Sequence, residues 1–160
     1  MSNQVYKNST VKYPLLNSGM AVYKLSASES VPNNASTRVT TWLQEYSTLD
    51  NHVSNASGLF TINSDGVYCI QANCIFSANV TGARSQSILY IGTVYSARVA
   101  NVEVLSAGAG DDTRLESSVI IQAYKGDQFE IDVFQNSGGA LNIFGNPADP
   151  FSKVIITRLA

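Results

Sequence analysis

The sequence is poor in charged residues, and its basic residues are scattered. Charged residues make up 14% of the 160 residues, against about 25% in an ordinary soluble domain. The ten Lys and Arg residues form no run, and the formal net charge is −2. Binding to phosphate backbones needs a concentrated basic surface, so we expect no nucleic-acid partner. A surface with little charge is expected where other subunits cover it or where a protein persists outside a cell; the plain alternative is a β-rich protein with uncharged loops.

Long apolar runs are also missing. No stretch approaches the roughly 20 apolar residues of a membrane span, and residues 1–4 (MSNQ) lack the charged-then-apolar order of a secretory signal. We therefore expect that the chain inserts into no membrane by itself and, if Met1 is the native start, that no leader directs its export.

Histidine and paired acids, the usual material of catalytic and metal sites, are scarce. His52 is the single histidine and lies in a polar loop, so we interpret it as an ordinary surface residue and expect no enzyme activity and no cofactor. Asp111 and Asp112, in a Gly-rich segment, are the candidates for a calcium site, although they lack the alternating spacing of a dedicated calcium loop.

The two cysteines, Cys69 and Cys74, are five positions apart. On one continuous strand they face opposite sides and lie roughly 16 Å apart at about 3.3 Å per residue. A disulfide needs Cα atoms within about 7 Å. The spacing predicts two free thiols, Cys74 in the core and Cys69 on the opposite face.

What the sequence does contain is period-two alternation between turn signals. Residues 59–76 (LFTINSDGVYCIQANCIF) read as two strands joined by the turn 63–66. Residues 37–43 read as one strand, and residues 125–127 as a hairpin turn rather than as the short adhesion tripeptide they also resemble. The whole pattern gives nine or ten short strands and no helix, which indicates an all-β sandwich or jelly roll. Periodicity alone leaves jelly roll and immunoglobulin-like sandwich open.

One domain accounts for the length. Residues 19–160 carry the strand pattern, and residues 1–18, interrupted by Pro14, are interpreted as an arm. The arm is either a frayed terminus or linker, or a segment that attaches the protein to a neighbour.

Several motifs resemble complement C1q-like domains. Phe60 is followed by Gly66 and Tyr68 in the spacing of that family's central signature; Gly126 lies in a turn like the family's, and Phe151 opens a segment like its closing strand. On physical grounds we expect Phe60 and Tyr68 to be cross-strand neighbours and Gly66 to adopt the positive φ that closes the turn. Ile70 and Ala72 depart from the family's aromatic pattern, and no collagen-like tract precedes the domain.

The resemblance implies a ten-stranded jelly roll of the C1q and tumour-necrosis-factor type, assembled as a homotrimer whose outer loops bind partners. We predict a non-enzymatic virion surface protein, such as a bacteriophage head fibre, capsid decoration or receptor-binding tip. Residues 1–18 would contact other virion proteins, and a cell-surface receptor or glycan is the expected external partner. The alternatives are a secreted recognition or signalling protein, a carbohydrate-binding module, and, from a different class, an enzyme on a cupin-like β fold.

Overall fold

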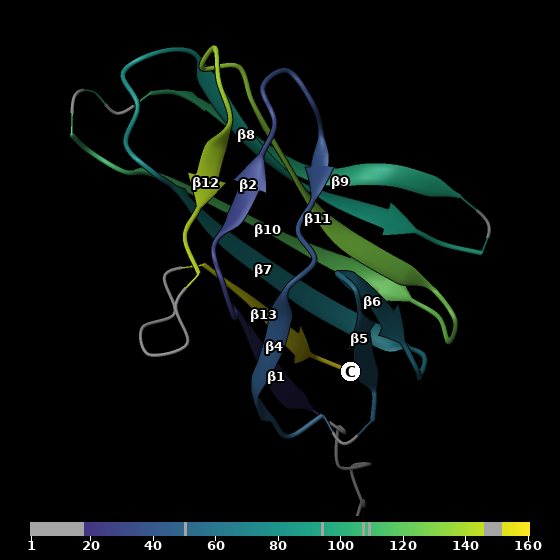
Figure 1. Ribbon diagram of the computed structural model, residues 1–160. Coiled ribbons are helices and arrows are strands. Elements are labelled where there is room, and N and C mark those ends of the chain that lie inside the picture. The colour runs from purple at the N-terminus through teal and green to yellow at the C-terminus, as the bar shows by residue number, and fades with distance from the viewer. Residues whose placement is uncertain (1–17, 50, 94, 107, 109, 146–151) are drawn as a thin grey trace, which may run out of the picture.

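The computed structural model describes residues 18–49, 51–93, 95–106, 108, 110–145 and 152–160. These residues form two antiparallel sheets packed face to face and contain no helix (Figure 1). Sheet A has seven strands: β1 (Gly19–Leu25), β2 (Glu29–Val31), β4 (Trp42–Ser47), β7 (Gly66–Phe76), β10 (Thr113–Ala123), β12 (Leu141–Ile143) and β13 (Lys153–Arg158). Sheet B has six: β3 (Thr37–Arg38), β5 (Val53–Ala56), β6 (Leu59–Ile62), β8 (Ala83–Ile91), β9 (Ser96–Leu105) and β11 (Gln128–Gln135).

The predicted all-β sandwich is confirmed, but the chain changes sheets more often than expected. β6 pairs with β5 and β11, whereas β7 pairs with β10, β12 and β13. Residues 63–66 therefore cross between the sheets and do not close a hairpin, so the expected pairing of Phe60 with Tyr68 is wrong. Residues 124–127 likewise join β10 in sheet A to β11 in sheet B. A tight turn is present there, but not a hairpin.

The described residues form thirteen strands, more than the predicted nine or ten, because short segments also pair. Residues 37–43 are two strands rather than one: β3 pairs with β11 in sheet B, and β4 pairs with β1 in sheet A. The segment between them crosses from one sheet to the other. Glu29 holds this crossing, because its carboxylate accepts hydrogen bonds from the amides of Thr40 and Thr41 at 2.9 and 2.5 Å.

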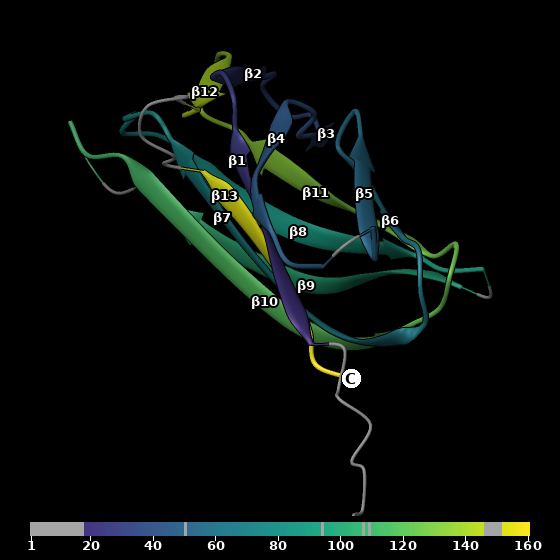
Figure 2. The ribbon, with the colours of Figure 1, turned by 90° about the horizontal axis from the view of Figure 1, so that it is seen from below.

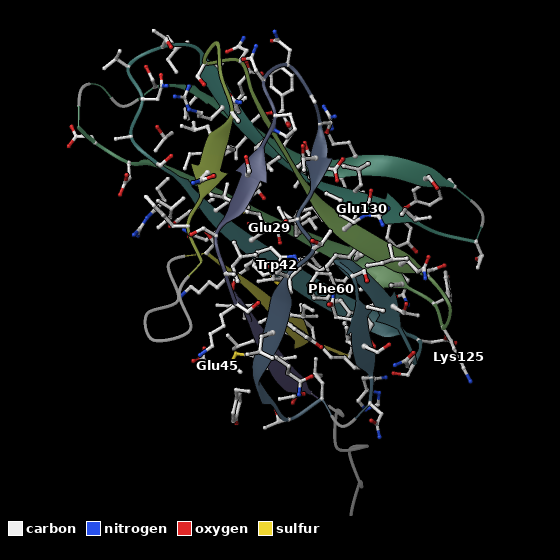
Figure 3. All side chains as sticks on the ribbon, viewed as in Figure 1. Glu29, Trp42, Glu45, Phe60, Lys125 and Glu130 are labelled. Atoms are coloured by element: carbon white, nitrogen blue, oxygen red, sulfur yellow. The ribbon has the colours of Figure 1, made fainter. Side chains whose placement is uncertain are left out.

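The core lies between the sheets and is centred on aromatic rings. Phe60 stacks on Phe129 with ring centroids 4.7 Å apart, and Tyr23 meets Phe60 edge-on at 5.0 Å. Trp42 completes the cluster from sheet A at 6.4 Å from Phe60, and Figure 3 shows these two labelled side chains together inside the sandwich. Such rings bury large apolar areas in preferred geometries, so this cluster is a main stabilising contact between the layers.

The two ends of the sandwich differ. At one end lie the C-terminus and the turns 63–66 and 124–127, joined where the amide of Lys125 donates to Asp65 at 2.8 Å. At the other end, loops from three connections are tied together: Thr81 donates to the carbonyl of Ser137 at 2.8 Å, and Ser106 to the carbonyl of Val80 at 2.8 Å. We call this second end the distal end (top of Figure 1).

Candidate assembly face

The outward face of sheet A is a regular lattice of side chains. Strands β10, β7, β13, β1 and β4 are neighbours in this sheet, and alternate residues on each point away from the core. The strand registers place these outward residues in three rows across the sheet: Leu43, Lys24, Lys153, Asn73, Glu116; Tyr46, Val22, Ile155, Gln71, Ser118; and Met20, Thr157, Cys69, Ile120. We call this lattice the assembly face.

Large apolar side chains stand exposed on the assembly face. Ile120 is 64% exposed, Leu43 51%, Tyr46 50% and Met20 37%, and half-buried Cys69 lies beside Ile120 and between Met20 and Ile120 in the same row. Single exposed apolar residues are ordinary, but several on one sheet face indicate an interaction surface. This face is suited to packing against another protein surface.

A polar depression of about 330 Å³ interrupts the apolar residues of the assembly face, lined by Gln71, Asn73, Glu116, Ser118, Lys153 and Ile155 among others. The Asn73 amide donates to the Glu116 carboxylate at 3.0 Å. The side-chain oxygen of Asn73 is buried and has no hydrogen-bond partner among the described residues. A buried acceptor left unpaired costs free energy, so a contact that supplies a donor here is favourable.

A second, different apolar surface runs along one edge of the sandwich. β10 is an edge strand of sheet A, β9 is an edge strand of sheet B, and the two lie side by side (Figure 2). Their inward residues pack against the core but remain only partly buried: Val99, Ala100, Val102 and Val104 on β9, and Val119 and Ile121 on β10. We call this the β9/β10 edge. Open edges with apolar side chains favour pairing with another chain.

The two aromatic residues of the central motif lie in the interior and not on this surface. Phe60 and Tyr68 are both fully buried, and the Tyr68 hydroxyl donates to the carbonyl of Ser64 at 2.8 Å, as an aromatic ring with a polar tip allows. Gly66 does not adopt a positive φ, so that expectation is wrong; a side chain there would lie 2.5 Å from the carbonyl of Ala160. Phe151 lies outside the described residues.

Gly126 and Asp127 show why the tripeptide at 125–127 acts as a turn. Gly126 has φ +96°, which favours glycine. Asp127 is 1% exposed and accepts hydrogen bonds from the Tyr90 hydroxyl and from the amides of Thr93 and Tyr124 at 2.9 and 2.8 Å. Its carboxylate is therefore not available to an outside partner.

These contacts shift the pKa values of both partners. Burial, and then the contact with Asp127, raises the pKa of the Tyr90 hydroxyl. Burial alone would raise the pKa of Asp127, but hydrogen bonds from Tyr90, Tyr124 and Thr93 outweigh it and lower the pKa below its usual 3.8. The pair is therefore a neutral phenol beside an ionised carboxylate.

The cysteines lie where strand parity predicts. Both are free; Cys74 is fully buried, and Cys69 lies half-buried on the assembly face. Burial, and then the charge of Glu29, raises the pKa of the Cys74 thiol. Both predictions from strand parity are confirmed.

Catalytic and metal-binding residues do not gather in the described part of the chain. There, His, Cys, Asp and Glu form no group of three that could hold a metal ion. Asp111 and Asp112 are exposed in the loop before β10, and calcium binding there stays a prediction. Nδ1 of His52 forms a hydrogen bond with the hydroxyl of Ser64, so this histidine has a partner that the sequence did not reveal.

No helix in the described residues is long and apolar enough to cross a bilayer.

A scan of protein families found no matching family, and a search of curated proteins found no matching sequence. Solved structures do match. A crystal structure of murine APRIL aligns with TM-score 0.69 and 12% identity over 89% of this chain and 99% of that one. Eiger TNF from S. frugiperda aligns with TM-score 0.68 and 13% identity over 88% and 92%. The chain has a jelly-roll fold of the tumour-necrosis-factor and C1q type.

Sequence reasoning did not find the assembly face, although a signal for it exists. β1 carries Met20 and Val22 on one side and Ala21 and Tyr23 on the other, and β13 carries Ile155 between Val154 and Ile156. A strand that is apolar on both sides is covered on both sides. In a two-layer sandwich the outer face of each sheet is normally exposed to water. Strands that are apolar on both sides therefore indicate that a partner covers the outer face.

Proposed function

We propose that the chain is a non-enzymatic recognition module that assembles as a homotrimer, with the β9/β10 edge of each copy packed on the assembly face of the next. The observation that carries the proposal is the presence of two unlike apolar surfaces on one protomer. A two-fold dimer joins a surface to itself, whereas unlike surfaces join head to tail and produce a ring when the rotation closes.

Three copies are favoured by the fold. The resemblance to C1q-like and tumour-necrosis-factor domains implies a trimer about a three-fold axis, and the low charge of the sequence supports extensive subunit contact. Holding three copies of each loop in fixed positions raises the strength of weak contacts through avidity. Recognition by such a trimer requires no catalytic residues.

The positions of the start of β1 and of the C-terminus support presentation of the distal end. β1 begins at Gly19, paired with Arg158 near the C-terminus, at the end opposite the distal loops (Figure 1). Residues 1–17 of the predicted arm lie outside the described residues. The chain enters β1 at that end, and an attachment through the preceding segment would leave the distal loops outward. We propose a virion surface protein, a bacteriophage head fibre, capsid decoration or receptor-binding tip, with a secreted recognition or signalling protein as the alternative.

Light scattering after size exclusion tests the assembly. Three protomers of 17.2 kDa give 3 × 17.2 = 51.6 kDa, and a mass of one protomer at all concentrations contradicts the trimer. Immunogold labelling of purified particles tests the location. Labelled particles support the virion role, and label confined to the culture medium supports the secreted alternative.

A further inference from the structure

The outward face of sheet B carries a trough that the assembly does not use. Ser85 and Ser87 on the central strand β8 lie between longer side chains: Phe134 and Glu103 flank Ser85, and Asp132 on β11 flanks Ser87. Neighbouring strands are about 4.8 Å apart, so the walls on β11 and β9 are about 10 Å apart. The result is a depression of about 260 Å³, which we call the trough. The residues that line it include Ser85, Ser87, Arg98, Glu103, Asp132 and Phe134.

The side chains around the trough have unused hydrogen-bonding capacity. One oxygen of the Asp132 carboxylate accepts from Ser36 at 3.2 Å, whereas the other is buried and unpartnered among the described residues. Arg98 and Glu103 are exposed, and their side chains form no hydrogen bond or ion pair within the described part of the chain. A carboxylate accepts up to about four hydrogen bonds and a guanidinium donates five. Donors and acceptors therefore line one depression without satisfying each other.

We propose that the trough binds one ring of a neutral carbohydrate. Each sugar hydroxyl both donates and accepts, so adjacent hydroxyls can pair with Asp132 and Glu103 as acceptors and with Arg98 as donor. The ring of Phe134 adds an apolar wall for the C–H face of the sugar. The volume is below the range of drug-sized pockets, which fits a single ring rather than a chain.

The charges around the trough favour a neutral ligand over a charged one. An acidic sugar would face the carboxylates of Glu103 and Asp132, and an ammonium group would face Arg98. The neighbouring Glu130 is already paired with Arg38 and supplies no free charge. A ligand with many hydroxyls and no charge can bond to both the carboxylates and the guanidinium. It brings no unpaired charge of its own into the trough, so no such charge has to be desolvated.

This inference rests on the proposed assembly for its multivalency, because contacts through sheet A and the β9/β10 edge leave the face of sheet B outward. Three troughs in one trimer would then bind a polysaccharide surface with avidity, although each site alone is expected to be weak. Binding in a single trough does not itself require three copies.

Amide NMR titration of the isotope-labelled full chain tests the proposal. The probes are the methyl glycosides of glucose, mannose, galactose and N-acetylglucosamine, with methylammonium and the methyl glycoside of N-acetylneuraminic acid as charged comparisons. We expect a neutral glycoside to shift the amides of Ser85, Ser87 and Asp132. Ser85→Leu fills the trough and Asp132→Ala removes the buried acceptor, and each should weaken binding about tenfold or more. Ser96→Leu, exposed on β9 outside the trough, should leave binding unchanged.

Three results would overturn the sugar site: no shift of trough amides with any neutral glycoside, equal binding by Ser85→Leu, or shifts produced only by the charged probes. Light scattering on the same samples separates this inference from the proposed assembly. A trimer without glycoside binding rejects the sugar site alone, and a monomer that binds a glycoside rejects the trimer alone.

Discussion

The hydroxyl of Tyr90 donates a hydrogen bond to the carboxylate of Asp127, and both side chains are buried. Tyr90 belongs to β8 in sheet B, and Asp127 ends the turn through which the chain leaves sheet A. This contact therefore fixes a crossing between the layers.

Removing the Tyr90 hydroxyl should destabilise the fold. Tyr90→Phe leaves the buried carboxylate with fewer donors, which should lower the free energy of unfolding by about 1–3 kcal/mol. Urea unfolding followed by fluorescence measures the change. Tyr95→Phe is the matched control, because Tyr95 packs against Tyr90 at 5.4 Å but is 56% exposed. Equal loss in both variants would contradict the role of the buried contact.

Asp127 should make stability sensitive to acid. Its pKa is lower in the folded state than the ordinary value of 3.8, so the unfolded state binds the proton more readily. The contribution is present above pH 4 and is lost as the pH falls through the folded-state pKa. Urea midpoints measured at descending pH should fall less steeply in Asp127→Asn than in the natural protein. Parallel curves would show that other carboxylates cause the acid sensitivity.

A charge among the exposed apolar residues of the assembly face should prevent assembly. Ile120→Glu would bury an unpaired carboxylate in the subunit contact, which costs several kcal/mol, so light scattering should give the mass of one protomer. Val80→Glu changes a residue that is 59% exposed in a distal loop, and the trimer should persist. A trimeric Ile120→Glu variant would exclude the assembly face as the contact.

The two thiols should report on burial and assembly separately. Cys74 should resist a thiol reagent until the chain unfolds, because it is fully buried and its pKa is raised. Cys69 lies beside Ile120, so it should be protected in the trimer and react in Ile120→Glu. Timed labelling followed by mass analysis distinguishes the two. Rapid labelling of Cys69 in the intact trimer would place the contact elsewhere.

Gly66 and Gly126 should differ in how they resist substitution. Gly66→Ala would place a side chain 2.5 Å from the carbonyl of Ala160 and displace the C-terminal segment, whose Ala160 carbonyl accepts from the Val67 amide at 2.9 Å. Gly126→Ala meets open space but a φ of +96°, which should cost about 1–2 kcal/mol. Chemical unfolding should show the larger loss for Gly66→Ala. The reverse order would contradict the close approach at the C-terminus.

The sequence was most informative where a single strand decides the outcome. The parity of Cys69 and Cys74 follows from side-chain alternation on β7, so their faces could be predicted without knowing any partner strand. The same holds for Phe129, Ile131 and Val133, which alternate with Glu130 and Asp132 on β11 and face the core.

Pairing between strands was not predictable in the same way. Alternation is identical whether the next strand lies beside the first or in the opposite sheet, so residues 63–66 read as a hairpin although they cross the sandwich. For the same reason, the sequence predicted one strand over residues 37–43 where the structure has β3 and β4 in different sheets. The trough depends on register among β8, β9 and β11, which no single segment of sequence specifies.

The hydrogen bond between Asp65 and the amide of Lys125 joins the two crossings at the end opposite the distal loops. At this end, the contact that holds sheets A and B together does not involve the distal loops. Sequence drift or deliberate grafting in those loops can change what the protein presents while the framework beneath stays the same. Such a separation lets one scaffold acquire new recognition surfaces without having to be refolded around each of them.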